Sequence, residues 1–242
     1  MNQNAVSAKD LTKKFGNFTA VNQLNFEVSK GEIFGFLGAN GAGKTTVIRM
    51  LSGLLKPSSG TANVAGFNLA TQVDQIKKSI GYMSQKFSLY LDLTVKENIQ
   101  FYGGIYGLSR KTIKEKTADL ITYLHLEDFM NKLAKELPLG FKQKLALSIS
   151  LMHDPAIVFL DEPTSGVDPI ARRDFWLLIH ALAGAGKTIF VTTHNMDEAE
   201  YCHRVSIMKD GVMIALDTPE NLKITFKETS MQEVFIKAVS LN

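Results

Sequence analysis

Continuous apolar runs separated by polar turns dominate the pattern of this chain. They occupy residues 33–37, 157–160, 188–193 and 205–208. Runs of this length without polar alternation are typical of strands that are buried on both faces, as in a parallel sheet. Between the runs, apolar residues recur at helical spacing, first over residues 47–55. The pattern therefore predicts an α/β core.

Two stretches differ from that core. Over the first thirty residues apolar and polar positions alternate, as at Val21, Leu24 and Phe26, and turn residues interrupt them. This alternation predicts short antiparallel strands. From about residue 91 to residue 154 the apolar spacing becomes helical, which predicts a group of helices between two parts of the core.

The expected organisation follows from these stretches. Residues 1–242 form a single domain, with an α/β core and an antiparallel β subdomain in residues 1–86 and 155–242. A helical lobe of about residues 87–154 is inserted into the core. Residues 228–242 hold a short C-terminal helix, which we expect to be a packing surface or a contact between copies. The sequence has no internal repeat and no low-complexity segment.

Two helix starts carry a capping box, in which a Ser or Thr and a Glu three residues later cap each other's backbone N–H groups. One consists of Thr94 and Glu97 in the lobe, and the other of Ser230 and Glu233 near the C-terminus. Both predict that a helix begins there.

Composition limits the functions that the chain can have. With 242 residues, 45% of them hydrophobic, the chain is long enough for one large domain. Its 27 basic and 24 acidic residues give a net charge of +3 without a basic block, so no nucleic-acid partner is predicted. No run reaches roughly eighteen apolar residues, and the N-terminus does not resemble a signal peptide, so no membrane span is expected. A single cysteine, Cys202, is typical of a reducing cytosol.

Residues 38–45 carry the most specific motif in the sequence. Gly-Ala-Asn-Gly-Ala-Gly-Lys-Thr fits G-x-x-x-x-G-K-[ST] and stands between a predicted strand and a predicted helix. Glycines let the backbone approach the phosphates of a nucleotide, and the helix directs its positive end at them. Lys44 is then placed to reach the β and γ oxygens, and the Thr45 hydroxyl to bind Mg²⁺. The sequence predicts binding of a nucleoside triphosphate.

A second glycine-rich stretch, residues 184–188, resembles half of this motif. It lacks the first glycine, because position 181 is Ala181, and it precedes an apolar run instead of following one. We interpret it as a turn.

Polar residues with catalytic potential end two of the apolar runs. Acids at the carboxyl end of a core strand lie in the crevice where open α/β sheets bind ligands. Asp161 is placed to hold Mg²⁺ through water, and Glu162 to orient and partly deprotonate the water that attacks the γ-phosphate. His194 follows the run of residues 188–193 and is expected at the same edge of the sheet. The alternatives are a helix N-cap for the two acids and a hydrogen-bonded core histidine.

In their order along the chain, these motifs resemble the nucleotide-binding subunits of ATP-binding cassette (ABC) transporters, over nearly the whole sequence. The resemblance implies a P-loop NTPase (RecA-like) core with the β subdomain and helical lobe described above. It also implies which residues of the Walker A loop contact ATP, namely Gly38, Asn40, Gly41, Ala42, Gly43, Lys44, Thr45 and Thr46.

The same resemblance implies further roles. Phe15 matches the aromatic residue that stacks on adenine, and Gln85 the glutamine that contacts both Mg²⁺ and the attacking water. Asp161 matches the Walker B acid, which completes a metal site with Thr45 and Gln85. The catalytic set is then Glu162, His194, Gln85 and Lys44, with His194 as the switch histidine. Residues 165–168 are similar to the D-loop of the family.

The family signature departs from its usual form in residues 137–144. Leu-Ser-Gly-Gly is here Leu-Pro-Leu-Gly, so that Pro138 replaces the serine and Leu139 the first glycine. Gly140 remains, and the N–H groups of the helix that follows can still face a phosphate held by a partner subunit. Loss of the serine contact costs roughly 1.5–3 kcal/mol of closed-dimer stability. This variant, and residues 194–200, resemble a branch of type-2 (ABC-2) exporters.

The resemblance implies an ATP-hydrolysing subunit of an ABC-2 drug or multidrug exporter, with ATP and Mg²⁺ as cofactors. A homodimer or pseudo-dimer would enclose two ATP molecules. An integral-membrane ABC-2 permease would hold the chain as a peripheral subunit on the cytoplasmic face of the inner or plasma membrane. Two alternatives are a regulatory cassette with little hydrolysis, motivated by Pro138 and Leu139, and a soluble ABC ATPase that acts on ribosomes or DNA.

Residues 86–90, Lys-Phe-Ser-Leu-Tyr, follow Gln85 directly. We hypothesise that they form part of a groove that receives a cytosolic helix of the permease, because aromatic and apolar residues lie beside a switch loop. The alternative is ordinary packing beneath the helical lobe.

Overall fold

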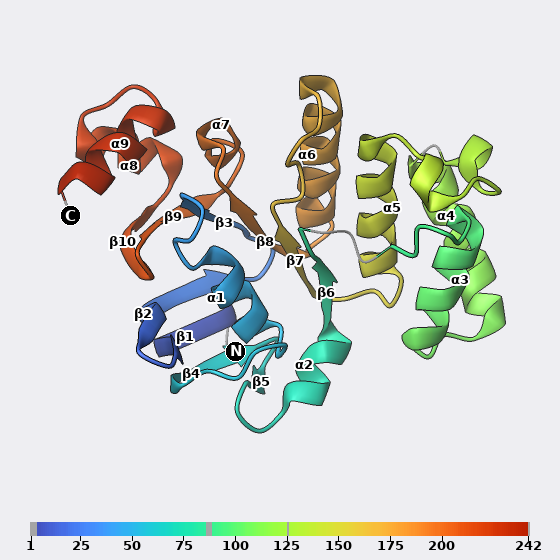
Figure 1. The fold of residues 1–242 in the computed structure, drawn as a ribbon, viewed down its shortest axis with the longest axis horizontal. Coiled ribbons are helices and arrows are strands. Elements are labelled where there is room, and N and C mark those ends of the chain that lie inside the picture. The colour runs from blue at the N-terminus through green and yellow to red at the C-terminus, as the bar shows by residue number, and fades with distance from the viewer. Residues whose placement is uncertain (1–3, 86–88, 125, 242) are drawn as a thin grey trace.

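The computed structural model describes residues 4–85, 89–124 and 126–241. It contains a six-stranded sheet in the order β10-β9-β3-β8-β7-β6 and a four-stranded sheet in the order β2-β1-β4-β5. Helices cover the larger sheet, and a group of helices extends from one end of it (Figure 1). The predicted α/β core, antiparallel β subdomain and helical lobe are therefore confirmed.

The six-stranded sheet consists of β3 (Ile33–Gly38), β6 (Ile80–Met83), β7 (Ile157–Asp161), β8 (Thr188–Thr193), β9 (Arg204–Lys209) and β10 (Val212–Asp217). All its neighbouring strands are parallel except β9 and β10. Side chains alternate between two hydrophobic cores. Phe34 and Phe36 of β3 belong to one, and Ile33 and Leu37 to the other. Because both faces are buried, the central strands have the unbroken apolar sequences from which they were predicted.

The four-stranded sheet consists of β1 (Asn4–Phe15), β2 (Phe18–Ser29), β4 (Ser59–Val64) and β5 (Phe67–Asn68). The prediction of short strands was wrong for β1 and β2, which are each 12 residues long. Their antiparallel pairing continues through several register shifts, one of them next to Asp10, whose φ is 52°. Such irregularities bend a strand without ending it, so each strand continues until the turn at residues 16–17 or 30–31.

A cluster of phenylalanines joins the two sheets. The ring of Phe26 on β2 lies 5.7 Å from that of Phe34 and 5.6 Å from that of Phe36, both on β3. Phe190 on β8 and Phe159 on β7 extend the cluster, with 4.8 Å between their ring centroids. Each such pair contributes about 0.5–1.5 kcal/mol beyond the burial of its area. The cluster fixes β3, whose carboxyl end leads into the glycine-rich loop.

Helices lie on both sides of the larger sheet. Between the two sheets lie α1 (Lys44–Leu51) and α2 (Val73–Ser79), and the opposite face is covered by α5 (Leu139–Leu151), α6 (Pro169–Gly184), α7 (Met196–Ala199), α8 (Pro219–Phe226) and α9 (Met231–Leu241). Within the described ranges, none of the helices combines the length and the apolar character needed to cross a membrane.

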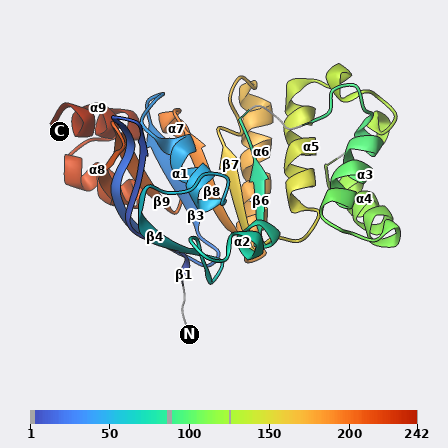
Figure 2. The same ribbon diagram turned by 60° about the horizontal axis from the view of Figure 1, so that its bottom comes forward.

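The helical lobe has a hydrophobic core of its own. Its further elements are α3 (Val95–Ile105), α4 (Arg110–Leu124) and the 3-10 turns η1 (Glu127–Phe129) and η2 (Ala134–Glu136). Val95, Ile99, Leu145 and Ile149 join α3 to α5 in this core. The lobe and the pair α8 and α9 lie at opposite ends of the molecule, which both views show (Figure 1, Figure 2).

The local helix signals were correct. Thr94 Oγ1 accepts a hydrogen bond from Glu97 N at 3.2 Å, and the Glu97 carboxylate accepts one from Thr94 N at 2.8 Å. Ser230 and Glu233 form the same reciprocal pair, at 3.3 and 3.2 Å. The stretch of residues 184–188 is the predicted turn, since α6 ends where it begins and β8 starts where it ends.

The junction between β6 and α5 leaves no room for a side chain at Gly81. A Cβ there would lie 2.3 Å from Ser150 O, a backbone atom that can move only with α5. We therefore expect Gly81→Ala to lower the free energy of unfolding by about 1–3 kcal/mol. Urea unfolding, followed by the fluorescence of Trp176, measures the change.

Gly104→Ala is the matched control. Gly104 lies in α3, and a Cβ there meets no atom within 4 Å, so this variant is expected to gain up to about 1 kcal/mol of stability. Equal unfolding midpoints for the two variants would contradict the close packing of β6 on α5.

Candidate functional site

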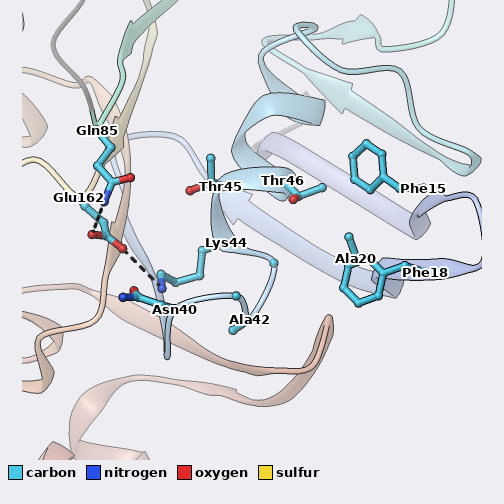
Figure 3. Close-up of a pocket in the computed structure, with 12 residues that line it drawn as sticks. Phe15, Phe18, Ala20, Asn40, Ala42, Lys44, Thr45, Thr46, Gln85 and Glu162 are labelled. Carbon is cyan, nitrogen blue, oxygen red and sulfur yellow. Dashed lines mark hydrogen bonds and ion pairs between the residues drawn. The ribbon is translucent and has the colours of Figure 1, made fainter.

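A cavity of about 510 Å³ lies between the four-stranded sheet and the carboxyl end of the larger sheet. Phe15 and Phe18 stand at one end of it and Gln85 and Glu162 at the other, with the loop before α1 between them (Figure 3). Its lining residues are Phe15, Phe18, Ala20, Asn40, Gly41, Ala42, Gly43, Lys44, Thr45, Thr46, Gln85 and Glu162. Almost the whole predicted ATP-binding set is thus brought together in one cavity.

The loop that forms the floor of this cavity depends on its glycines. Gly41 and Gly43 have φ values of 86° and 101°, in the left-handed region that side chains disfavour. A Cβ on Gly43 would also lie 2.6 Å from Ala20 O on β2. Because α1 begins directly after Gly43, at Lys44, the positive end of the helix faces the cavity. This arrangement suits an anionic group such as a phosphate.

Lys44 is buried at the centre of the site. Its Nζ donates hydrogen bonds to Gly38 O at 2.7 Å and Ala39 O at 3.1 Å, and it lies 3.7 Å from Glu162 Oε1. Burial lowers the pKa of Lys44, although the nearby carboxylates of Glu162 and Asp161 oppose this shift. The Lys44 ammonium group thus pairs with carbonyl and carboxylate oxygens. Phosphate oxygens would be stronger partners for it.

Asp161, at the end of β7, is almost fully buried and accepts two hydrogen bonds through one oxygen. Thr45 Oγ1 donates to Asp161 Oδ1 at 3.0 Å and Thr192 Oγ1 at 2.6 Å. Burial raises the pKa of Asp161, and the two hydroxyl donors counteract part of that shift. A carboxylate and a hydroxyl are hard oxygen ligands, and Mg²⁺ is usually bound by one or two such groups together with substrate phosphates. Thr45 and Asp161 therefore fit a magnesium ion.

Glu162 has an unusual backbone conformation for a non-glycine residue, with φ at 48°. Its N–H group donates to Thr192 O at 3.1 Å and to Thr192 Oγ1 at 2.9 Å, which holds the residue in this conformation. Backbone strain of this kind costs about 1–3 kcal/mol and is concentrated at functional sites. Here it turns the carboxylate away from the line of β7 and into the cavity.

Three side chains from different elements converge on the Glu162 carboxylate. Gln85 Nε2 donates to Oε2 at 2.9 Å, and His194 Nδ1 lies 3.1 Å from the same oxygen. Lys44 contacts the other oxygen, Oε1. The carboxylate itself is 8% exposed, whereas the His194 side chain is 47% exposed and open to further contacts. A carboxylate so oriented can accept a proton from a water molecule bound beside it.

Sequence reasoning missed three residues of the site. Thr192 bonds both to Asp161 and to Glu162, and Phe18 and Ala20 line the cavity at the end where Phe15 lies (Figure 3). A threonine near the carboxyl end of a buried apolar strand was a usable signal, because Thr192 pairs in register with Asp161. Phe15 is 50% exposed and Phe18 64% exposed, so both rings are free to stack on a flat ligand.

The signature segment lies outside this cavity. Gly140 is in the first turn of α5, which begins at Leu139 after Pro138, and Pro138 offers no side-chain cap. A Cβ on Gly140 would lie 3.2 Å from that of Ala171, and one on Gly166 would lie 3.5 Å from Leu139 Cδ2. The segment thus packs against the loop of residues 165–168. Among the predicted nucleotide-binding residues, Gly38 and Gly140 do not line the cavity, although Gly38 contacts Lys44 through its carbonyl oxygen.

The sequence is similar to known protein families and to several named proteins. A family model described as ABC transporter matches residues 21–165, and an AAA domain model matches residues 133–198. The "Probable multidrug ABC transporter ATP-binding protein YbhF" of Escherichia coli (strain K12) is 48% identical over 98% of this chain. The chain covers 42% of that relative's length. The Nod factor export ATP-binding protein I of Rhizobium etli is 37% identical over 90% of the chain and 69% of its own length.

Solved structures show the same fold. An ATP-binding subunit of an ABC transporter superposes with a TM-score of 0.87 at 26% identity, over 97% of this chain and 99% of its own. An ATP-binding cassette solved as a dimer in a post-hydrolysis state, bound to ADP and Pi, has a TM-score of 0.80 at 26% identity. This superposition covers 88% of the present chain and 98% of the other.

The buried charge of Asp161 is predicted to lower the stability of the fold. Because burial raises the pKa of Asp161, the folded protein binds a proton there more tightly than the unfolded chain does. Asp161→Asn removes the charge but keeps an oxygen for both hydroxyls. We expect the variant to have the higher urea midpoint at pH 7. The difference from the parent should shrink as the pH falls through the folded pKa toward the ordinary value of 3.8.

Asp174→Asn serves as the control, because Asp174 is exposed on α6 and its replacement is expected to shift the midpoint little at any pH. A lower midpoint for Asp161→Asn at pH 7 would show that the ionised carboxylate stabilises the fold.

Proposed function

The chain belongs to the ABC transporter family, and on this premise we propose that it is the ATP-binding and ATP-hydrolysing subunit of an ABC-2-type exporter. The single observation that carries the proposal is the convergence of Lys44, Gln85 and His194 on the Glu162 carboxylate, beside a glycine-rich loop. Phosphate binding needs only the loop. The strained, shielded carboxylate is needed only if a bond is broken.

The side chains would divide the work as follows. Lys44 would exchange its carbonyl partners for the β- and γ-phosphate oxygens, and Phe15 would stack on the adenine. Thr45 and Asp161 would hold Mg²⁺, with Gln85 within reach of it, and the ion would neutralise developing charge on the phosphates.

Glu162 would orient the attacking water and take its proton, while Gln85 keeps the carboxylate aligned. His194 would contact the γ-phosphate and bond to the same Glu162 oxygen as Gln85. Most of the rate enhancement would come from positioning and from charge neutralisation by Lys44 and the start of α1.

Two subunits, as a homodimer or a pseudo-dimer with a second cassette, would complete each site. The start of α5 around Gly140 lies away from the chain's own cavity, which suits a surface that covers a nucleotide bound by another subunit. Pro138 and Leu139 leave only backbone groups for that contact. The dimeric cassette bound to ADP and Pi supports this arrangement by analogy.

Transport requires a separate membrane protein. We propose that an integral-membrane permease holds the chain on the cytoplasmic face of the membrane. The names of the relatives, which refer to multidrug transport, Nod factor export and linearmycin resistance, support export as the direction. They do not identify a substrate for this chain.

The contact with the permease would involve the aromatic surface that follows Gln85. Residues 86–88 of the hypothesised groove lie outside the described residues, but Tyr90 is 49% exposed and Phe101 is 41% exposed. Their rings meet edge to face at 4.7 Å on the outside of the helical lobe. Leu89, in contrast, packs between the cores of the lobe and the larger sheet, as the alternative interpretation expects.

One alternative function has an observation in its favour. A regulatory cassette that binds ATP with little hydrolysis would explain the loss of the signature hydroxyl at Pro138. The intact set of Glu162, Gln85 and His194 favours turnover instead. A soluble ABC ATPase that acts on ribosomes or DNA has no such support in the structure.

Mg-ATP hydrolysis by the purified chain tests the proposal, together with Glu162→Gln. We expect the parent to release phosphate and the variant to lose at least about 100-fold in kcat, because the proton acceptor is removed. The variant should form an ATP-dependent dimer in size-exclusion chromatography, because closure persists when hydrolysis fails.

Glu220→Gln, a change of an exposed acid on α8, is the control and should retain parental turnover. ATP binding by the parent without phosphate release, alone or with the permease, would contradict hydrolysis and favour the regulatory alternative.

The aromatic surface is tested by replacing Tyr90 and Phe101 with glutamate. A buried charge at an apolar contact is costly, so the double variant should no longer copurify with the permease. Its basal ATPase activity should stay within about twofold of the parent, since neither ring contacts the nucleotide cavity. Ile224→Glu, at an apolar residue of α8 that is 73% exposed, should leave copurification unchanged. Retention of the double variant on the permease would refute this interface.

A further inference from the structure

Glu198 is a buried carboxylate that the proposed chemistry does not use. It lies on α7, four residues after His194, and its side chain is 3% exposed. Thr164 Oγ1 donates a hydrogen bond to Glu198 Oε1 at 2.6 Å, and Arg172 Nε forms an ion pair with the same oxygen at 3.4 Å. Within the described part of the chain, Glu198 Oε2 has no hydrogen-bond partner. Burial of an incompletely paired charge lowers stability, so an apolar residue would serve packing better.

The two partners of Glu198 stand on either side of one exposed loop. Thr164 directly precedes the loop of residues 165–168, and Arg172 lies in the first turn of α6, directly after it. Asp168 ends the loop and caps α6, accepting hydrogen bonds from the N–H groups of residues 170 and 171 at 3.0 Å each. Both ends of the loop are therefore tied to a single carboxylate.

Glu198 also belongs to the same short segment as His194, the residue that contacts Glu162. Its N–H group donates to Asn195 O at 3.2 Å, and Asn195 N donates to Thr193 Oγ1 at 2.9 Å. The segment from His194 to Glu198 is thus a short, internally bonded unit. A cavity of about 60 Å³ is lined by Glu162, His194 and Glu198 together.

We propose that Glu198 is a positioning residue, which holds the loop of residues 165–168 and the His194 segment as one unit. This unit keeps the His194 imidazole against Glu162, with Nδ1 at 3.1 Å from Oε2. Leu139 of the signature segment packs on the same loop, at Gly166. The inference rests on the proposed ATPase function and assigns to it a residue that does not line the cavity around Lys44.

The test separates turnover from binding. Glu198→Gln can still accept the hydrogen bond from Thr164 but loses the ion pair with Arg172, and Thr164→Val loses the hydrogen bond. We expect each variant to lower kcat for Mg-ATP by about tenfold, because small misplacements of reacting groups are costly. KM for ATP should stay within about twofold of the parent, since the binding cavity is unchanged. Thr164→Ser should restore parental kcat, because it restores the hydroxyl.

Combining the two changes measures whether they act through one contact. The double variant should be no slower than the slower single variant, because both changes break the same connection. Glu200→Gln is the control on the same segment, where an exposed acid pairs with Lys223, and it should leave kcat unchanged. Urea midpoints of all variants show how much of each is folded in the assay.

The outcomes distinguish this inference from the proposed function. Additive losses in the double variant, an equal rise in KM, or a kcat loss that matches the unfolded fraction would overturn the role of Glu198. Parental kcat in both single variants would do the same. Absence of turnover in the parent, with or without the permease, would instead contradict the ATPase function and the inference that rests on it.

Discussion

The site depends on one carboxylate, that of Glu162, which accepts contacts from a lysine, an amide and an imidazole carried by different elements. It reaches them because its backbone leaves the line of β7 in a left-handed conformation. That conformation is held by Thr192 on the neighbouring strand. The parallel register of β7 and β8 therefore determines whether these contacts with Glu162 can form. The phenylalanines that fix β3 beside these strands contribute to the same alignment. The fold acts on the chemistry mainly through this alignment.

The buried ionic groups of this site lower the stability of the fold. Burial lowers the pKa of Lys44 and raises that of Asp161, so each group is held as an ion at a cost in free energy. Hydrogen bonds to backbone carbonyls and to threonine hydroxyls offset only part of that cost. Phosphate oxygens and a cation are stronger partners for these groups, so a bound nucleotide with its metal ion would offset more of this cost than the protein's own groups do. Activity and stability make opposite demands on these residues.

Much of this could be predicted from the sequence where the signal is local. The glycine loop, the buried strands, both capping boxes and the positions of Asp161 and His194 at strand ends follow from patterns within a few residues. What could not be predicted depends on contacts between distant segments. The length of β1 and β2 is one example, because their pairing continues through register shifts that the sequence pattern does not reveal. Glu198 acquires its partners only once neighbouring strands and helices are placed, and no motif marks it. Thr192 is indicated only by its place near the end of a buried apolar run.

We infer that Glu162 serves bond breaking and not nucleotide binding. A calorimetric titration of ATP, without Mg²⁺, into the parent chain and into Glu162→Gln separates these two roles. In the variant a neutral amide replaces the carboxylate that lies 3.7 Å from Lys44 Nζ, and a negative charge near the phosphates is removed. We expect Glu162→Gln to bind ATP at least as tightly as the parent chain does. Binding that is about tenfold weaker, a loss of roughly 1.4 kcal/mol, would mean that Glu162 shapes the binding site and would contradict the division of roles.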